Sequence, residues 1–304
     1  MRDKKILITG PAGHLTIPIV RELAPHNDVW GLARFSDPAQ RTMLEELGVT
    51  CVKKDLATDP LDDLPTDFDC VFHAGAMVAM ASENDMAYTF EVNVQGTGKL
   101  LDHCRDVGTF VFCSTGGVYA HQPHPVKETD DYGAPIPAYS LSKIAAEQLV
   151  TYLATKHAIP TIILRIGAVY GPDATGPMVR INRMLRGKEI WVNPAEPRKG
   201  SVMWVDDAVR LAIVAMERGE VPPVVTNFCG DDPVSIDEYC TYAGELLGVE
   251  PIFKWTEDTY PSNTMDTTRM HQVLGRAEVG WKEGFRRLLE SQFPDRTLNV
   301  PGDD

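Results

Sequence analysis

The chain has 304 residues, of which 43% are apolar, so it can form one large domain or two domains around a substantial core. Its 29 basic and 43 acidic residues give a formal net charge of −14. An acidic chain lacks the cationic surface that nucleic-acid backbones and anionic membranes attract, so neither is expected as a partner. The six cysteines form no CxxC pair, which indicates reduced thiols and predicts no metal site.

The sequence shows no segment that would direct the chain to a membrane. No stretch approaches the ~20 consecutive apolar residues that a membrane-spanning helix needs. Residues 1–5 lead directly into an apolar strand, without the apolar region and cleavage site of a signal peptide. A soluble, cytoplasmic protein is therefore expected.

Short apolar runs alternate with helical patterns through the first half of the chain. The apolar runs predict strands at residues 5–9, 28–32, 50–53, 70–73, 109–113 and 161–165. Helices are predicted at 16–23, 43–47, 90–105 and 139–156. The alternation is typical of βαβ units, and unbroken apolar strands are typical of a sheet covered by helices on both faces. The predicted fold class is therefore α/β with a parallel sheet.

The pattern changes after Gly171 and Pro172. Proline and glycine become more frequent, and helices expected at 179–186 and 235–247 alternate with short strands. A smaller, mixed domain that covers the substrate is expected here.

A glycine-rich turn follows the first strand, in the segment Thr9-Gly10-Pro11-Ala12-Gly13-His14-Leu15-Thr16. Glycines in a strand-turn-helix segment let backbone N–H groups approach a pyrophosphate, and the helix dipole favours negative charge there. Thr16 departs from this pattern, because a third glycine usually allows close packing of the helix on the strand. The turn predicts a dinucleotide site at Gly10, Gly13, His14 and Leu15.

The end of the second strand indicates which dinucleotide is bound. NAD enzymes usually place an acidic residue there to bind the ribose hydroxyls, and this chain has Ala33 followed by Arg34. Because a guanidinium pairs well with a phosphate, the sequence favours NADP(H), with NAD(H) as the alternative. A solvated arginine at a strand end would give the same pattern.

Tyr139 and Lys143 lie four residues apart, and therefore on one face of the predicted helix. A tyrosine has an ordinary pKa near ~10, which a neighbouring ammonium and an oxidised nicotinamide would lower enough for acid–base work. Tyr152 and Lys156 repeat the spacing further along the helix, where a packed tyrosine and a surface lysine are expected. Upstream, Thr115 follows a strand and offers a hydroxyl for a substrate oxygen, although capping hydroxyls at strand ends are common.

These motifs together resemble the extended short-chain dehydrogenase/reductase family, the NAD-dependent epimerase/dehydratase group. The resemblance covers nearly the whole chain, and its motifs occur in order at Gly10…Gly13, Asp55-Leu56, 71–76, 93–97, 114–119, Tyr139…Lys143, 164–172 and 205–207. It implies a Rossmann domain with a doubly wound parallel sheet at residues 1–171 and about 202–229. A substrate domain is implied at about 172–201 and 230–304.

The resemblance also implies roles for individual residues. Tyr139 would be the acid/base, Lys143 its partner and Thr115 the hydroxyl that orients the substrate. Further cofactor contacts are assigned to Arg34, Asp55, Leu56, Ala74, Gly75, Asn93 and Ile166. The candidate substrate contacts besides Thr115 are Met77, Ala168 and Val169.

Three departures from the family pattern concern the substrate. Ala168 replaces an asparagine, and Gly200 an arginine, that hold the diphosphate of nucleotide sugars in many members, although Arg198 and Lys199 lie nearby. Gly116-Gly117 replaces the Asp-Glu pair of the dehydratases. The departures argue against dehydration and against a nucleotide sugar.

Three functional hypotheses follow. The first is an NADP(H)-dependent oxidoreductase that acts on a carbonyl or secondary alcohol of a small molecule. The second is a nucleotide-sugar epimerase with retained NAD. The third is a sensor without catalytic activity, which the intact Thr115, Tyr139 and Lys143 disfavour. The resemblance further implies a homodimer formed through helices 90–105 and 139–156.

Overall fold

The computed structural model describes residues 1–133, 136–174 and 176–299. Its main element is a seven-stranded sheet in which every neighbouring pair is parallel. The strand order is β10 (Val224–Phe228), β6 (Thr161–Ile166), β5 (Thr109–Thr115), β4 (Cys70–His73), β1 (Lys5–Thr9), β2 (Asp28–Ala33) and β3 (Thr50–Lys53). The six predicted strands are all present, and β10 adds one edge. The α/β, Rossmann-type prediction is confirmed.

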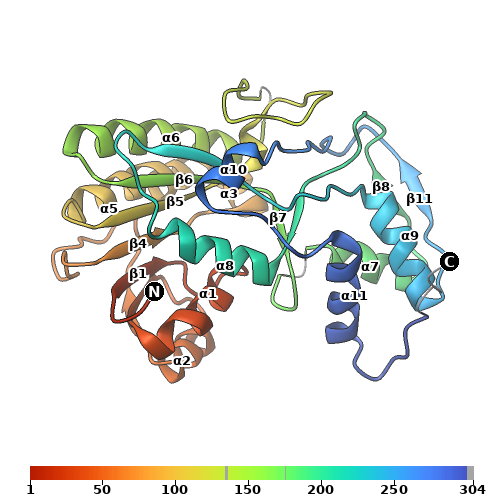
Figure 1. The fold of residues 1–304 in the computed structure, drawn as a ribbon, viewed down its shortest axis with the longest axis horizontal. Helices are drawn as coiled ribbons and strands as arrows, with labels where there is room; N and C mark the ends of the chain where they lie inside the picture. The colour runs from red at the N-terminus through yellow and green to blue at the C-terminus, as the bar shows by residue number, and fades with distance from the viewer. Residues whose placement is uncertain (134–135, 175, 300–304) are drawn as a thin grey trace.

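Helices cover both faces of this sheet (Figure 1). The helices α1 (Thr16–Leu23), α2 (Pro38–Glu46) and α8 (Val205–Ala215) share a core with Ile6 and Ile8 of β1. On the other face, α5 (Thr97–His103) and α6 (Ala138–His157) share a core with Leu7. Successive side chains of a strand point to opposite faces, so β1 contributes to both cores and its carboxyl end is fixed between them.

The helix predicted at 90–105 is divided into several elements. After α3 (Ala79–Asn84) and α4 (Met86–Phe90), the segment Glu91–Gly96 forms a π-helical turn, η2, before α5 begins. A side chain at Gly96 would place its Cβ 2.8 Å from the Cβ of Leu56. The chain therefore approaches the 55–56 loop more closely than a regular helix with larger residues would allow.

A second group of elements packs around its own core, to the right in Figure 1. Tyr170 and Tyr239 each stack on Phe285, with ring centroids 4.7 Å apart. The group contains α7 (Met178–Leu185), β8 (Ile190–Val192), α9 (Ile236–Leu247), β11 (Phe253–Trp255) and α11 (Trp281–Gln292). The short strands β7 (Ala168–Tyr170) and β9 (Val202–Trp204) pair between this group and the large sheet, and α10 (Thr268–Val273) packs beside β10. The predicted domain bounds stay a prediction.

Two findings concern predictions made from composition. All six cysteines are free thiols, and all but Cys51 are buried. Within the described ranges, no helix combines the length and the apolar character needed to cross a bilayer.

Candidate functional site

The glycine-rich turn between β1 and α1 approaches the loop after β4 very closely. Gly10 has a φ of +63°, and a Cβ there would lie 3.0 Å from the Cα of Gly75. The hydroxyl of Thr16 donates to the carbonyl of Gly10 at 2.5 Å, which closes the turn. Thr16 therefore replaces the expected glycine without opening the turn, because its hydroxyl takes part in it.

A second contact joins this turn to the segment before α7. The ring Nδ1–H of His14 donates to the carbonyl of Asp173, and Arg21 forms an ion pair with the Asp173 carboxylate at 2.5 Å. His14 also lines the cavity described next. The carboxyl-terminal half of the chain thus helps to hold the glycine-rich turn.

Two small cavities follow the carboxyl ends of the parallel strands on either side of Gly10. The first, of about 270 Å³, is lined by residues that include Gly13, His14, Leu15, Ala74, Thr115, Tyr139, Lys143, Ile166 and Val169. The second, of about 220 Å³, includes Arg34, Asp55, Leu56, Gly75 and Met77. Ligands of open α/β sheets bind in this crevice, and the side-chain-free cradle at Gly10 and Gly75 fits a pyrophosphate between the two cavities.

Arg34 directly follows the last residue of β2, Ala33, and lines the second cavity. Its guanidinium hydrogen-bonds the hydroxyl of Tyr88 at 3.2 Å, and that hydroxyl donates to Asp55. The next residue, Phe35, has a φ of +45° and packs into the core, which leaves Arg34 and Ser36 exposed on either side of it. Among the described residues Arg34 forms no ion pair with a carboxylate, whereas Lys54 in the same cavity pairs with Asp63 at 2.7 Å.

Tyr139 and Lys143 lie at the start of α6, beside the first cavity. Lys143 is 2% exposed, and its ammonium donates to the carbonyl of Cys113 at 2.8 Å and lies 5.9 Å from the centre of the Tyr139 ring. Burial lowers the pKa of Lys143 to about 8 and raises the pKa of Tyr139 to about 12. Desolvation is the main cause of the raised pKa of Tyr139 in the chain without cofactor. The lowering of this pKa by the ammonium together with an oxidised nicotinamide stays a prediction.

The second pair, Tyr152 and Lys156, lies outside these cavities. Tyr152 is 62% exposed, so the prediction of a packed tyrosine is wrong. Cys113 is buried beside Lys143, and burial raises the pKa of its thiol to about 12, so the thiol stays protonated at neutral pH.

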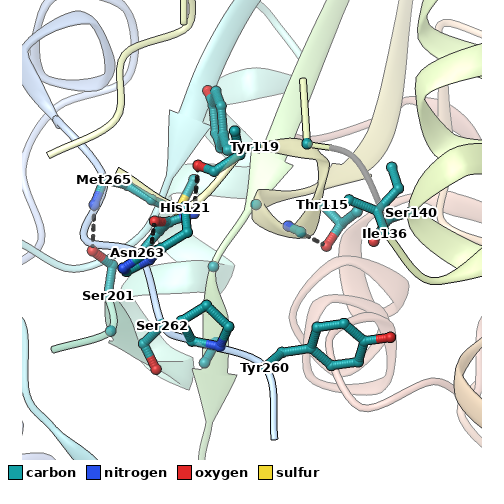
Figure 2. Close-up of a pocket in the computed structure, with 18 of the residues that line it drawn as sticks. Thr115, Tyr119, His121, Ile136, Ser140, Ser201, Tyr260, Ser262, Asn263 and Met265 are labelled. Atoms are coloured by element: carbon teal, nitrogen blue, oxygen red, sulfur yellow. Dashed lines mark hydrogen bonds between the residues drawn. The ribbon is translucent and has the colours of Figure 1, made fainter. Parts of the chain in front are cut away.

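Thr115 connects the first cavity to a larger pocket of about 680 Å³, shown in Figure 2. The pocket walls come from both halves of the chain: Thr115, Tyr119, His121 and Ser140 on one side, and Gly200, Ser201, Tyr260, Asn263 and Met265 on the other. Ala168, a candidate substrate contact, also lines it. A substrate in this pocket would therefore meet the Thr115 hydroxyl next to Tyr139 and Lys143.

Three predicted site residues lie elsewhere than expected. Met77 and Val169, expected at the substrate, line the two smaller cavities instead. Asn93, expected at the cofactor, is buried behind them: its side chain accepts from the N–H of Met77 at 2.7 Å and donates to the carbonyl of Met77 at 3.0 Å. Asn93 belongs to the π-helical turn, so it fixes the wall of the second cavity from behind.

The described wall of the larger pocket contains no lysine or arginine. Arg198 pairs with Glu196 at 3.2 Å and Lys199 with Glu238 at 3.1 Å, so the two cations that precede Gly200 form ion pairs with residues outside the pocket wall. His121 does line the pocket, and its two ring nitrogens lie 3.2 Å from the Asn263 side-chain oxygen and the Glu196 carbonyl.

Sequence reasoning missed two buried groups beneath the site. His73 is fully buried between the hydroxyls of Thr9 and Thr97, at 2.7 and 2.8 Å, and burial lowers its pKa to about 3. Thr9 in turn accepts from the N–H of Gly75 at 2.8 Å, so a neutral His73 holds the loop that carries the cradle. The second group is the ion pair between Glu147 and Arg165, at 2.8 Å. Glu147 lies four residues after Lys143, and Arg165 directly precedes Ile166. Nothing in the sequence indicates that Glu147 and Arg165 form a pair.

Known proteins resemble this chain along most of its length. The model of the NAD dependent epimerase/dehydratase family matches residues 6–227. YtcB of Bacillus subtilis, named an uncharacterized UDP-glucose epimerase, is 26% identical over 291 residues, which cover 89% of this chain and 92% of that protein. D-erythronate dehydrogenase of Cupriavidus necator is 28% identical over 178 residues, or 54% of this chain and 55% of that one.

A solved structure of UDP-glucuronic acid 4-epimerase from Bacillus cereus, in complex with UDP-glucuronic acid and NAD, has the same fold. The two structures superpose with a TM-score of 0.82 over 94% of this chain and 98% of that one, at 22% sequence identity. The family model spans well over half of the sequence and includes the glycine-rich turn, Thr115, Tyr139 and Lys143. The chain therefore belongs to the NAD-dependent epimerase/dehydratase family and is an enzyme of the short-chain dehydrogenase/reductase superfamily.

Proposed function

We propose that this enzyme transfers a hydride between a nicotinamide dinucleotide and the carbon of a secondary alcohol, and that it returns the hydride within the same turnover, as an epimerase does. The observation that carries the proposal is the position of Thr115, which lines both the cavity of Tyr139 and Lys143 and the larger pocket. The similarity to named epimerases favours return of the hydride over net oxidation.

Each residue then has one task. Thr115 orients the substrate oxygen, and Tyr139 takes its proton and later gives it back. When bound, the oxidised nicotinamide supplies the hydride acceptor and a positive charge. Because Tyr139 has a pKa raised to about 12 in the chain alone, it needs both this charge and the ammonium of Lys143 to act as a base.

Two observations bear on the choice between NAD(H) and NADP(H), and each favours a different cofactor. The solved structure of UDP-glucuronic acid 4-epimerase from Bacillus cereus contains NAD. In this chain, Ala33 occupies the position where NAD enzymes carry an acidic residue, and the exposed guanidinium of Arg34 faces the same cavity. We infer that the site accepts NAD(H) and prefers NADP(H).

A second function is supported by the pocket itself: net oxidation or reduction of a substrate that carries no diphosphate. The described pocket wall has no lysine or arginine to neutralise a diphosphate, and D-erythronate dehydrogenase is among the similar proteins. Dehydration is not proposed, because a Cβ at Gly116 would lie 2.9 Å from the sulfur of Met265 and a Cβ at Gly117 2.8 Å from the hydroxyl of Ser140. This chain has glycines in place of the acidic pair of a dehydratase, and an acidic pair would require the ends of the Met265 and Ser140 side chains to move.

The experiment compares the two functions on one preparation. The purified protein is analysed for bound nucleotide and then incubated with UDP-glucose or UDP-glucuronic acid without added cofactor, and products are identified by NMR. In parallel, D-erythronate is offered with NAD⁺ or NADP⁺, and reduced cofactor is followed by absorbance. Epimer formation that Tyr139→Phe abolishes supports the first function, whereas reduced cofactor without epimer supports the second. Activity that survives in Tyr139→Phe contradicts both.

We further infer a cytoplasmic homodimer that forms through α5 and α6. Exposed apolar side chains on and near α6 support this inference, namely Val78, Met86, Leu141 and Tyr152. Light scattering should give about twice the 33.6 kDa of one chain. A particle of one chain mass would contradict the dimer.

A further inference from the structure

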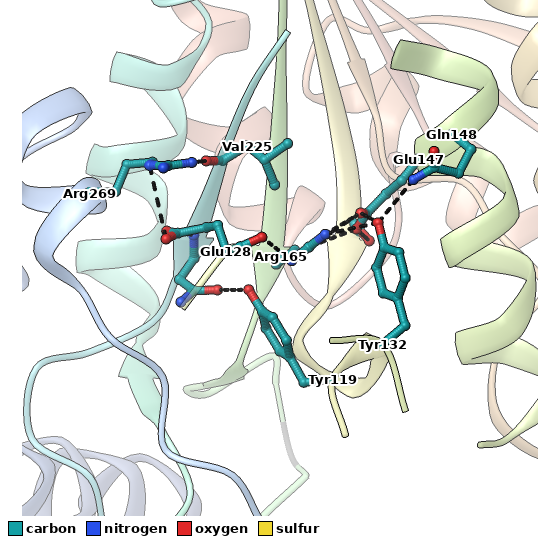
Figure 3. A network of polar contacts seen from close by, with 10 residues as sticks. Tyr119, Glu128, Tyr132, Glu147, Gln148, Arg165, Val225 and Arg269 are labelled. Atoms are coloured by element: carbon teal, nitrogen blue, oxygen red, sulfur yellow. Dashed lines mark hydrogen bonds and ion pairs between the residues drawn. The ribbon is translucent and has the colours of Figure 1, made fainter. Parts of the chain in front are cut away.

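A buried carboxylate lies directly behind the acid–base pair. Glu147 is 2% exposed, and its carboxylate receives the guanidinium of Arg165 at 2.8 Å (Figure 3). The hydroxyl of Ser114 donates to the other carboxylate oxygen. Ser114 lies on β5 and Arg165 on the neighbouring strand β6, and the two residues are directly opposite each other in the register of these strands. Glu147 therefore connects α6 to the ends of both strands.

These strand ends carry the functional groups of the site. Ser114 lies between Cys113, whose carbonyl accepts from Lys143, and Thr115, whose hydroxyl faces the larger pocket. On the helix, Tyr139, Lys143 and Glu147 recur every four residues and so follow one side of α6. A shift of Glu147 would thus move the helix that carries Tyr139 relative to the strand that carries Thr115.

The same ion pair holds part of the pocket wall. Arg165 donates to the carbonyl of Glu128 and to the hydroxyl of Tyr132, both at 3.1 Å, and its guanidinium lies 4.9 Å from the centre of the Tyr119 ring. Tyr119 lines the larger pocket. Asn227 of β10 also anchors this loop, because its side chain donates to the carbonyl of Val126 at 2.9 Å and accepts from the hydroxyl of Tyr119 at 2.5 Å. The ion pair is therefore one of the buried links between the loop and the sheet (Figure 3).

We propose that Glu147 is a positioning residue for hydride transfer: held by Arg165, it fixes Ser114 and thereby the spacing between Thr115, Tyr139 and Lys143. This inference rests on the proposed function, because it assigns Glu147 a task in that reaction. Glu147 itself lines none of the three cavities of the site. It acts through the residues that do.

The charge of Glu147 can be tested because the other groups around Lys143 stay neutral. On β4, His73 has a pKa lowered to about 3, and on β5 Cys113 has a pKa raised to about 12. On α6, Tyr139 has a pKa raised to about 12. The guanidinium of Arg165, on β6, faces Glu147. Burial lowers the pKa of Lys143 to about 8, and the carboxylate of Glu147 opposes this effect.

The test measures NADH binding by fluorescence between about pH 6 and about pH 10, for the wild type and for Glu147→Gln. Wild-type affinity should fall above pH 8, where Lys143 loses its proton. In Glu147→Gln the fall should begin at a lower pH, because the pKa of Lys143 is no longer raised by the carboxylate. Once a substrate is known, kcat should fall more than KM rises.

Asp207→Asn is the matched control. Asp207 is 3% exposed and pairs with Arg210 at 2.6 Å on α8, so the variant also loses a buried carboxylate, but away from the site. It should leave the pH profile of NADH binding unchanged. Should Glu147→Gln not fold, the double variant Glu147→Gln with Arg165→Met tests the positioning role, because it removes the link between α6 and the strand ends and leaves no buried charge unpaired. Since both charges are lost, its pH profile should change little, but its NADH affinity near pH 7 should fall, and an affinity equal to that of the wild type overturns the inference.

The outcomes separate this inference from the proposed function. A folded variant whose profile coincides with that of the wild type overturns the role of Glu147 and leaves the proposed function standing. A wild-type protein that binds neither NADH nor NADPH refutes the proposed function instead. An earlier fall in affinity in both Glu147→Gln and Asp207→Asn would show a general loss of stability and would also overturn the inference.

Discussion

At the scale of single residues, Arg34 is the side chain that can discriminate between the two nicotinamide dinucleotides. Among the described residues its guanidinium has no carboxylate partner, so it is available for a 2′-phosphate. A hydrogen bond to a charged group contributes about 1.5–3 kcal/mol, so Arg34→Ala should weaken NADPH binding about 10- to 150-fold. Fluorescence titration with NADPH and NADH measures the change.

NADH is the internal control for this variant, because it carries no 2′-phosphate. Its affinity should change less than about threefold, within the range of a weak surface contact. Equal losses for the two cofactors would mean that Arg34 supports the cavity wall through Tyr88 and does not read the phosphate.

His73 predicts a dependence of stability on pH. Its pKa is about 3 in the folded chain and near 6.5 when unfolded, so below pH 6.5 the unfolded chain binds more protons. The contribution of neutral His73 to the free energy of unfolding is therefore fully present above pH 6.5 and is lost as the pH falls toward 3. When the pH is lowered from about 6.5 to about 5, the free energy of unfolding should fall by about 1.5 kcal/mol less in His73→Gln than in the wild type. Urea denaturation at the two pH values measures this difference. Parallel losses in the two proteins would assign the acid sensitivity to other groups.

At the scale of elements, the π-helical turn η2 supports the cofactor groove through Asn93. Asn93→Leu removes the partners of the Met77 N–H and carbonyl, which lie on the groove wall. An unpaired buried group costs about 1–3 kcal/mol, so NADH affinity should fall about tenfold. Asn227→Leu, which also breaks buried hydrogen bonds, should lower the melting temperature without this loss of affinity. Equal affinities in the Asn93 variant and the wild type would refute the role of η2.

The sequence predicted those elements whose signal is local. Apolar runs located six strands of the sheet, three of them with the observed bounds, and the glycine-rich turn located the cradle. The π-helical turn and the left-handed Phe35 were not predicted, because both result from contacts between distant segments such as Gly96 with Leu56. For the same reason the pairing of Glu147 with Arg165 required the structure.

At the scale of the whole molecule, the larger pocket is built from two halves of the chain, and the charge of its described wall is the basis of the second proposed function. Gly200 lines the pocket, and a Cβ there would make only ordinary contacts, 3.6 Å from the Cβ of Ser262. Gly200→Arg should therefore place a guanidinium in the pocket and raise the affinity for UDP at least about tenfold, the contribution of one charged hydrogen bond. Calorimetry on the cofactor-loaded protein measures this.

Gly200→Gln is the matched control, because it adds a side chain of similar length without charge. It should leave UDP binding as weak as in the wild type. Tight UDP binding by the wild type would contradict the second function and show that backbone groups suffice for a diphosphate. The identities of Gly200 and Ala168 were readable from the sequence, but the ion pairs that engage Arg198 and Lys199 were not.

The contact of Asp173 with Arg21 and His14 has a consequence for the preparation of the protein. Arg21 and Asp173 are both partly exposed, so their attraction is screened at high ionic strength, where the Debye length falls to ~3 Å at 1 M salt. A weaker contact loosens the glycine-rich turn. The fraction of chains that retain nucleotide should therefore fall when the salt concentration of the purification buffer is raised. Cofactor content is consequently informative only for material that was kept at low ionic strength.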